Sequence, residues 1–190
     1  LPQREPPTLK HLKQAKHHEW ALKETQRMRP VANVIVRVAT KPLRVGDYEI
    51  PAGWLVMAAP CVGHMLPAVF PHPERYDPQR FSPERAEDKR PYTLIGFGGS
   101  THRCVGVNFA YLEMKVIVAL LMRRYALELV DRDPQYVAGA TTKWPQRPCR
   151  VRYVRRDLAS TAFGAGFAAS FAAATHDAAI AAGCPAHVHA

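Results

Sequence analysis

Apolar residues recur at two different spacings along the chain, and each spacing predicts a different kind of element. Helical spacing predicts α-helices over residues 8–29 and 105–124. The first helix should end near Pro30, because the residue before a proline disfavours helical backbone. A short helix is expected over 58–66.

β-branched residues favour strands between and after these helices. Residues 34–39 are expected to form one strand. Residues 43–57 should form a hairpin that turns near Gly46-Asp47 and returns after Pro51-Ala-Gly53. Two later strands are expected at 125–130 and 149–154, with irregular chain over 67–96 and a loop over 138–145. The fold class is therefore mainly α with small β-sheets (α+β).

The composition is ordinary for a globular protein, with 47% hydrophobic and 22% charged residues in a chain of 190. We find no apolar run long enough to cross a bilayer, and residues 1–20 are charged rather than signal-like. The four cysteines, which are Cys61, Cys104, Cys149 and Cys184, form no Cys-x-x-Cys pair. This spacing argues against a zinc site or a disulfide framework and fits a reducing cytoplasm.

The formal net charge of +10 has two interpretations. A basic chain can be a nucleic-acid-binding module, or it can simply have a basic solvated surface. The charges are spread over ordinary amphipathic segments, and no nucleic-acid-binding motif is present. We therefore favour the solvated surface and expect no nucleic-acid partner.

Cys104 lies in the most informative stretch of the sequence, Phe97-Gly-Gly-Ser-Thr-His-Arg-Cys-Val-Gly106. The glycines permit a tight loop, and the apolar spacing that follows places Cys104 at or just before a helix N-terminus. The helix dipole and the neighbouring His102 and Arg103 favour the thiolate. A thiolate in a glycine loop beside an aromatic ring suits an axial ligand of haem iron. The simpler alternative is a buried free cysteine near a helix start.

Two further motifs precede this loop. Glu24 and Arg27 stand at i and i+3 of the first predicted helix, a spacing that alone indicates only a solvated ion pair. Tyr76-Asp-Pro-Gln-Arg80-Phe81 follows in the irregular segment.

The three motifs, in this order, resemble the C-terminal part of the cytochrome P450 family, most closely its bacterial sterol 14-demethylase branch. Ser100 departs from the pattern, which usually has glycine there. The resemblance implies haem b with Cys104 as axial ligand. It also implies a buried Glu24–Arg27–Arg80 network that clamps the haem-binding core. The further roles that it implies are propionate binding by Arg37 and His102, shielding of the sulfur by Phe97, backbone hydrogen bonds to the thiolate around Gly106, and a substrate lining that includes Val34, Ile35, Thr142 and Lys143.

The family's activity would be insertion of one oxygen atom from dioxygen into a hydrophobic, sterol-like substrate. Electrons would come from NAD(P)H through an acidic, ferredoxin-type redox partner, which Lys115, Arg123 and Arg124 could steer. The family's oxygen-activating distal helix has no counterpart in residues 1–19, so the resemblance implies a fragment. A non-catalytic truncated relic and a basic binding module remain the alternatives.

The chain divides into two parts on this interpretation. Residues 1–156 correspond to the C-terminal part of the haem domain, from the helix of Glu24 to the final strands. Residues 157–190 are alanine-rich and interrupted by Gly164, Gly166, Gly183 and Pro185. We expect this tail to be disordered or weakly helical and unrelated to the family.

Overall fold

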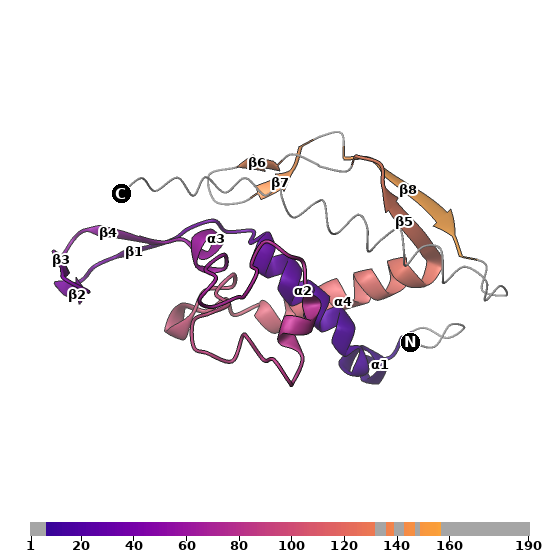
Figure 1. Cartoon of the computed structure of the whole chain (residues 1–190), viewed down its shortest axis with the longest axis horizontal. Coiled ribbons are helices and arrows are strands. Elements are labelled where there is room, and N and C mark those ends of the chain that lie inside the picture. The colour runs from indigo at the N-terminus through magenta and orange to yellow at the C-terminus, as the bar shows by residue number, and fades with distance from the viewer. Residues whose placement is uncertain (1–6, 132–135, 139–142, 147–148, 157–190) are drawn as a thin grey trace.

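A computed structural model describes residues 7–131, 136–138, 143–146 and 149–156 (Figure 1). Most of the described helices pack against one another, and short pairs of strands extend from them. The helices are α1 (Leu9–Gln14), α2 (Lys16–Met28), α3 (Pro60–Gly63) and α4 (Val107–Arg124), with 3-10 turns η1 (Pro78–Phe81) and η2 (Ser100–His102).

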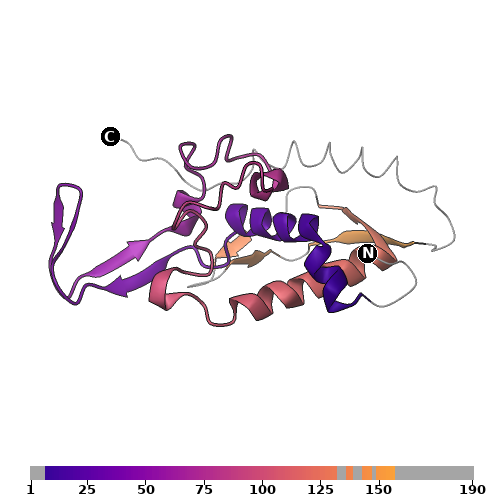
Figure 2. The same ribbon diagram turned by 90° about the horizontal axis from the view of Figure 1, so that it is seen from below.

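Helix α2 is the centre of the molecule, packed against α4 on one side and η1 on the other (Figure 2). Helix α1 also packs on α4, and its N-terminus is capped by Thr8, whose side chain accepts from the His11 amide. Among the described residues the buried apolar side chains are few, and they come from helices, strands and irregular chain: Leu12, Ala39, Phe70, Phe81, Val107, Ala119 and Ala126.

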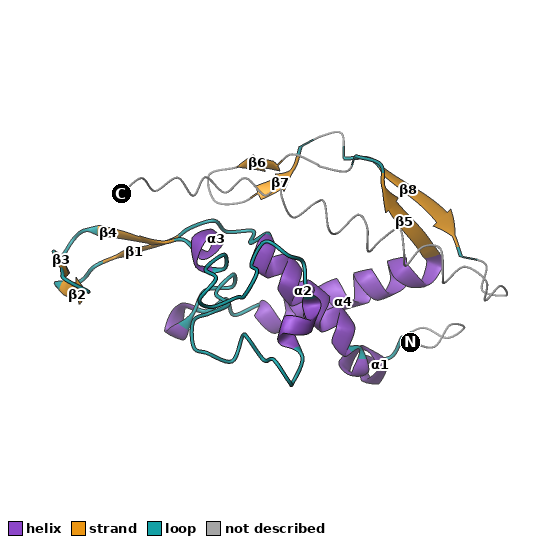
Figure 3. Cartoon of the chain, viewed as in Figure 1, coloured by secondary structure: helices purple, strands orange, loops and turns teal. Residues whose placement is uncertain are grey.

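The described strands form antiparallel pairs, drawn in orange in Figure 3. In the first hairpin, Gly46 has φ +58 between β2 and β3, a backbone region that glycine enters without strain. Strand β4 then returns along β1, so that Ile35 faces Ala58. The strands are β1 (Ile35–Val38), β2 (Leu43–Val45), β3 (Tyr48–Ile50), β4 (Leu55–Ala58), β5 (Tyr125–Leu129), β6 (Tyr136–Ala138), β7 (Lys143–Pro145) and β8 (Val151–Arg155).

The mixed α+β architecture, the hairpin, the helix after Cys104 and the last strand pair agree with the sequence-based predictions. Two predictions were wrong. The helix expected over 8–29 is broken at Ala15, where ψ is 66°. Alanine itself favours helix, so the break reflects how α1 and α2 each pack on α4. The loop expected over 138–145 contains the paired strand β7.

Residues 64–106 connect α3 to α4 with only η1 and η2 as regular elements, as expected for 67–96. Apolar packing alone, to which Phe70 and Phe81 contribute, does not explain the order of this connection. The largest fully buried side chains of the described residues include Arg27, Arg80, His64 and Glu24. Polar contacts from α2 therefore hold the connection.

Within the described residues, we find no helix with the length and apolar character needed to span a membrane.

Candidate functional site

The carboxylate of Glu24 is completely buried and lies between two guanidiniums. Arg27 binds it with two parallel hydrogen bonds, from Nε to Oε2 at 2.7 Å and from Nη2 to Oε1 at 2.9 Å. Arg80 reaches across from η1 and donates from Nε to Oε1 at 3.2 Å. The structure thus brings together the three residues that the sequence analysis placed in one network.

The remaining donors of the two arginines mostly bind backbone carbonyls of the 64–75 segment, and Arg80 Nη1 also donates to Glu87 Oε2 at 3.2 Å. Arg27 donates to the carbonyl of His64 at 2.9 Å and of Pro73 at 2.7 Å, and Arg80 donates to that of His72 at 2.6 Å. A buried ion pair is stable only when its other polar atoms are also satisfied. Here that condition is met, and it fixes the irregular chain onto α2.

The loop that carries Cys104 is closed by hydrogen bonds at its base. The Cys104 amide donates to the carbonyl of Phe97 at 2.8 Å, and the Gly98 amide donates to that of Ile95 at 2.8 Å. Gly98 has φ +76, and a Cβ there would meet the His102 carbonyl oxygen at 3.0 Å. Gly106 is the N-cap of α4. Cys104 therefore lies just before a helix N-terminus and is exposed.

Phe97 connects this loop to both long helices. Its ring lies 5.5 Å from that of Tyr111 on α4, with the planes tilted by 49°. The Tyr111 hydroxyl donates to the Gln26 side-chain oxygen on α2. Burial raises the pKa of Tyr111 to about 12, so this hydroxyl keeps its proton near neutral pH. Phe97 is thus supported by α4 directly and by α2 through Tyr111.

His64 is a buried residue of this site that sequence reasoning missed. Its Nδ1 lies 3.2 Å from the carbonyl oxygen of Arg27, and its Nε2 accepts from the Ile95 amide at 3.0 Å. Burial, together with the Arg27 charge, lowers its pKa from 6.5 to about 4. No motif marks this histidine in the sequence, because its partners are backbone groups far along the chain.

The other residues named by the resemblance lie on the surface or outside the described residues. Arg37 on β1 is exposed and donates to the carbonyl of Val36 at 2.7 Å. His102 in η2 is exposed. Val34 is exposed and Ile35 half-buried. Thr142 lies outside the described residues, as does the side chain of Lys143, whose backbone belongs to β7.

Lys115 corrects one expectation about the basic surface. Its ammonium lies 2.7 Å from Glu19 Oε2, and only 14% of its side chain is exposed. It therefore ties α4 to α2 rather than presenting a charge for a partner. Arg124 is exposed at the end of α4, and Arg123 is half-buried.

The donor set around Cys104 suits a metal that brings most of its own ligands. Among the described residues, no group of three or more His, Cys, Asp or Glu side chains could hold a bare metal ion. A single thiolate is sufficient for haem iron, because the porphyrin supplies four nitrogens. Two apolar side chains close to the cysteine in the sequence are also exposed, Val105 by 85% and Phe109 by 70%. Haem therefore fits this loop.

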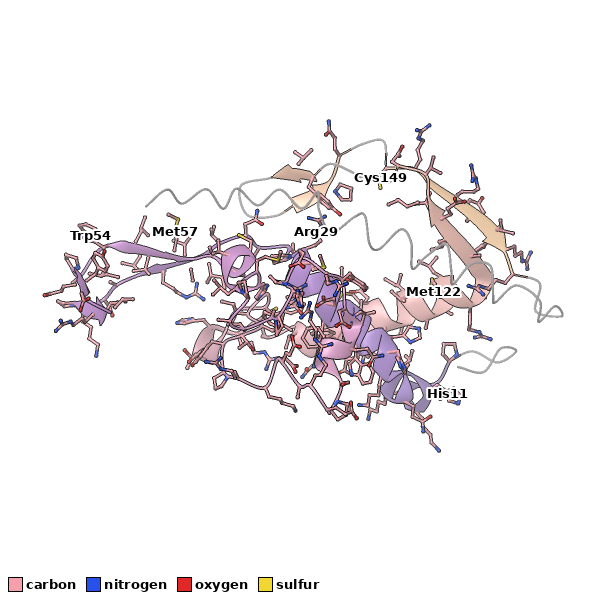
Figure 4. All side chains as sticks on the ribbon, in the orientation of Figure 1. His11, Arg29, Trp54, Met57, Met122 and Cys149 are labelled. Atoms are coloured by element: carbon pink, nitrogen blue, oxygen red, sulfur yellow. The ribbon has the colours of Figure 1, made fainter. Side chains whose placement is uncertain are left out.

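A second exposed apolar surface lies on the hairpin of β1 and β4. Trp54 and Met57 mark it in Figure 4, and they are 62% and 68% exposed. Val36, Val38 and Leu55 of the same pair are also exposed. Such a surface is typical of a face that binds a ligand or another part of a protein.

Comparison with known proteins gives a consistent answer. Residues 1–144 match the cytochrome P450 family. The chain is 38% identical to sterol 14α-demethylase of Mycolicibacterium vanbaalenii over 72% of its own length and 31% of that protein. It is likewise 38% identical to sterol 14-demethylase of Arabidopsis thaliana, over 72% of the chain and 30% of that protein. Among solved structures, retinoic acid bound cyanobacterial CYP120A1 matches with a TM-score of 0.73 and 27% identity, over 78% of this chain and 35% of that one.

Proposed function

This chain belongs to the cytochrome P450 family, and we propose that it forms the cysteine-bearing side of a haem-thiolate monooxygenase. The single observation that carries the proposal is Cys104, exposed on a closed glycine loop at the start of α4. The chain spans about a third of the curated relatives that it matches, at 31% and 30% of their length. The activity of the whole domain is therefore part of the proposal.

Each residue of the cysteine loop and of the elements around it has a distinct role in this proposal. Bound haem would supply the activation of dioxygen, with the Cys104 thiolate as its axial ligand. Phe97 would limit the access of water to the sulfur. Arg37 and His102 would bind the propionates, and the backbone N–H groups around Gly106 would hydrogen-bond the thiolate. The buried Glu24–Arg27–Arg80 network would keep the loop in place without taking part in proton transfer.

A hydrophobic, sterol-like compound is the substrate that we propose. The support is the identity to two sterol 14-demethylases and the apolar character of Val34 and Ile35 beside the exposed hairpin. Thr142 and Lys143 would complete the lining. Apolar walls with few polar groups suit such a ligand.

The electron donor in this proposal is an acidic, ferredoxin-type protein that ultimately draws on NAD(P)H. Arg103 beside the cysteine and Arg124 at the far end of α4 are exposed cations that could attract it. Scattered cysteines fit a reducing compartment, and we propose the cytoplasm.

The test is a spectrum of the full chain reconstituted with haem, reduced and exposed to carbon monoxide. A thiolate-ligated complex gives a strongly red-shifted Soret band, which should vanish in Cys104→Ala. Cys149→Ala is the matched control, because Cys149 is also exposed but lies near β8 (Figure 4). The band should survive in that variant.

Absence of the band in the parent chain, or its persistence in Cys104→Ala, would overturn the proposal. The chain would then retain the family's fold elements without a working haem site.

A further inference from the structure

His64 combines complete burial with hydrogen bonds at both ring nitrogens. One partner is the Arg27 carbonyl, which only accepts, and the other is the Ile95 amide, which only donates. Nδ1 must therefore carry the proton and Nε2 must carry a lone pair. The surroundings select one neutral tautomer of the ring.

The two hydrogen-bond partners of His64 belong to different parts of the site, the end of α2 and the chain that leads into the cysteine loop. The Arg27 carbonyl lies in the last turn of α2, where carbonyls have no intrahelical partner. Ile95 lies two residues before Phe97, at the entry to the cysteine loop. The imidazole of His64 thus connects the C-terminus of α2 to Ile95, where the chain enters the cysteine loop.

A short series of hydrogen bonds connects Ile95 to the cysteine. The Ile95 carbonyl accepts from the Gly98 amide at 2.8 Å, which forms the turn around Phe97. The Phe97 carbonyl accepts from the Cys104 amide, also at 2.8 Å. The position of the Ile95 amide therefore sets where the turn begins, and the turn carries the acceptor that holds the Cys104 backbone.

We propose that His64 is a positioning residue for the cysteine loop, acting through its hydrogen bond from the Ile95 amide. The ring nitrogens of His64 pair with Arg27 and Ile95 rather than with Cys104, and the proposal rests on the proposed function only in assigning haem to that loop. The hydrogen bond to the Arg27 carbonyl holds the ring against α2. The hydrogen bond from the Ile95 amide then fixes Ile95, and with it the start of the cysteine loop, relative to the ring.

Two substitutions separate these bonds. In His64→Gln the side-chain amide oxygen falls near the place of Nε2 and can still accept from Ile95. In His64→Asn the shorter amide falls near Nδ1, so it can still donate to Arg27 but leaves Ile95 without an acceptor. Leu12→Ala is the control for general loss of stability, because Leu12 is buried on α1, away from the loop.

The first measurement is hydrogen exchange of the haem-free full chain over residues 95–104. We expect exchange at the Ile95 and Cys104 amides to rise about tenfold or more in His64→Asn and to stay within about threefold of the parent in His64→Gln. Equal increases in the two variants, or an equal increase in Leu12→Ala, would overturn the proposal. If His64→Asn does not fold, His64→Gln alone decides: lost protection at Ile95 contradicts the proposal, and retained protection supports it.

The second measurement is the fraction of the red-shifted carbon monoxide band after haem reconstitution. It should fall in His64→Asn and persist in His64→Gln. If the parent chain shows no such band, the proposed haem function fails, while the exchange experiment still decides the role of His64.

Discussion

Arg27 and His64 each bind the other's backbone. The guanidinium of Arg27 donates to the carbonyl of His64 at 2.9 Å, and Nδ1 of His64 lies 3.2 Å from the carbonyl oxygen of Arg27. Both side chains are fully buried. This reciprocal pair fixes α3 and the following chain against the end of α2, and the Glu24 network continues from the same guanidinium.

Glu24→Gln should strongly destabilise the chain. It removes the carboxylate that Arg27 and Arg80 share and leaves the buried Arg27 without a counter-charge, while Arg80 keeps Glu87 at 3.2 Å. We expect a loss of roughly 3–5 kcal/mol in the free energy of unfolding, measured by urea titration. The matched control is Glu128→Gln, in an exposed pair with Arg152 at 2.9 Å, which should change stability by less than about 1 kcal/mol. Similar losses in both variants would contradict the clamp.

Ser100→Gly should stabilise the cysteine loop. Ser100 has φ +55, in the left-handed region where a Cβ is strained, so the departure from glycine in the sequence carries a conformational cost of about 1 kcal/mol. The variant should unfold at higher urea and retain more haem in a titration. Ser82→Gly is the control, because Ser82 has φ −65, and it should gain nothing. Equal or weaker haem retention in Ser100→Gly would count against the strain.

The elements of this fold were largely predictable from the sequence because their signals are local. Gly46 marks a turn between β-branched runs, and Pro30 follows closely after α2 ends. The cysteine loop was predictable from its glycines. The break at Ala15 was not, because packing against α4 produces it and alanine gives no local sign.

Long-range polar partners were mostly not revealed by the sequence, and the contact of Glu24 with Arg80 was expected only from the family resemblance. Lys115 was expected to face a redox partner but pairs with Glu19, which is distant in sequence. His64 carried no motif at all. In both residues the decisive partner comes from another element, so only the folded chain identifies it.

Stability should fall as the pH drops from about 6.5 to 4 because of His64. Its pKa is lowered to about 4 in the folded chain, by burial and then by the Arg27 charge, while the unfolded value is 6.5. Between these values the unfolded chain binds a proton that the folded chain does not, so acid favours unfolding. The difference corresponds to about 3 kcal/mol, lost over that range.

Urea titrations at several pH values measure this slope. It should become markedly flatter in His64→Gln, since the glutamine does not titrate. His72→Gln serves as the control, because the His72 side chain is 73% exposed, and its slope should match the parent. An unchanged slope in His64→Gln would show that other groups cause the acid sensitivity.

Lys115 and Arg124 should respond differently to substitution. Lys115→Gln breaks the half-buried pair with Glu19, so we expect it to lower the free energy of unfolding by about 1 kcal/mol, with little effect on an acidic partner. Arg124→Gln should leave stability nearly unchanged but slow association with an acidic ferredoxin at low salt. Surface plasmon resonance at two salt concentrations, beside urea titration, measures both. Slower association in Lys115→Gln with unchanged stability would reverse the assignment.

Gly96 and Gln26 should show strong coupling in a double-mutant cycle. A Cβ on Gly96 would clash with Gln26 Nε2 and lie 2.7 Å from its Cγ, so the glutamine would have to move. Moving the glutamine has a cost, because its side-chain oxygen accepts from the part-buried Tyr111 hydroxyl. We expect Gly96→Ala to cost about 1–3 kcal/mol and to weaken haem retention through Phe97, whose ring packs on Tyr111.

In the background of Gln26→Ala the same Gly96→Ala change creates no clash with Gln26, because the clashing atoms of that side chain are gone. Its cost should then fall by about 1 kcal/mol or more, which is the coupling that urea titration of all four chains measures. Additive effects would show that Gly96→Ala destabilises the chain through the backbone at position 96, and not through a clash with Gln26 of α2. The glutamine, the tyrosine and the glycine would then support Phe97 independently, and the cysteine loop would not depend on their contact.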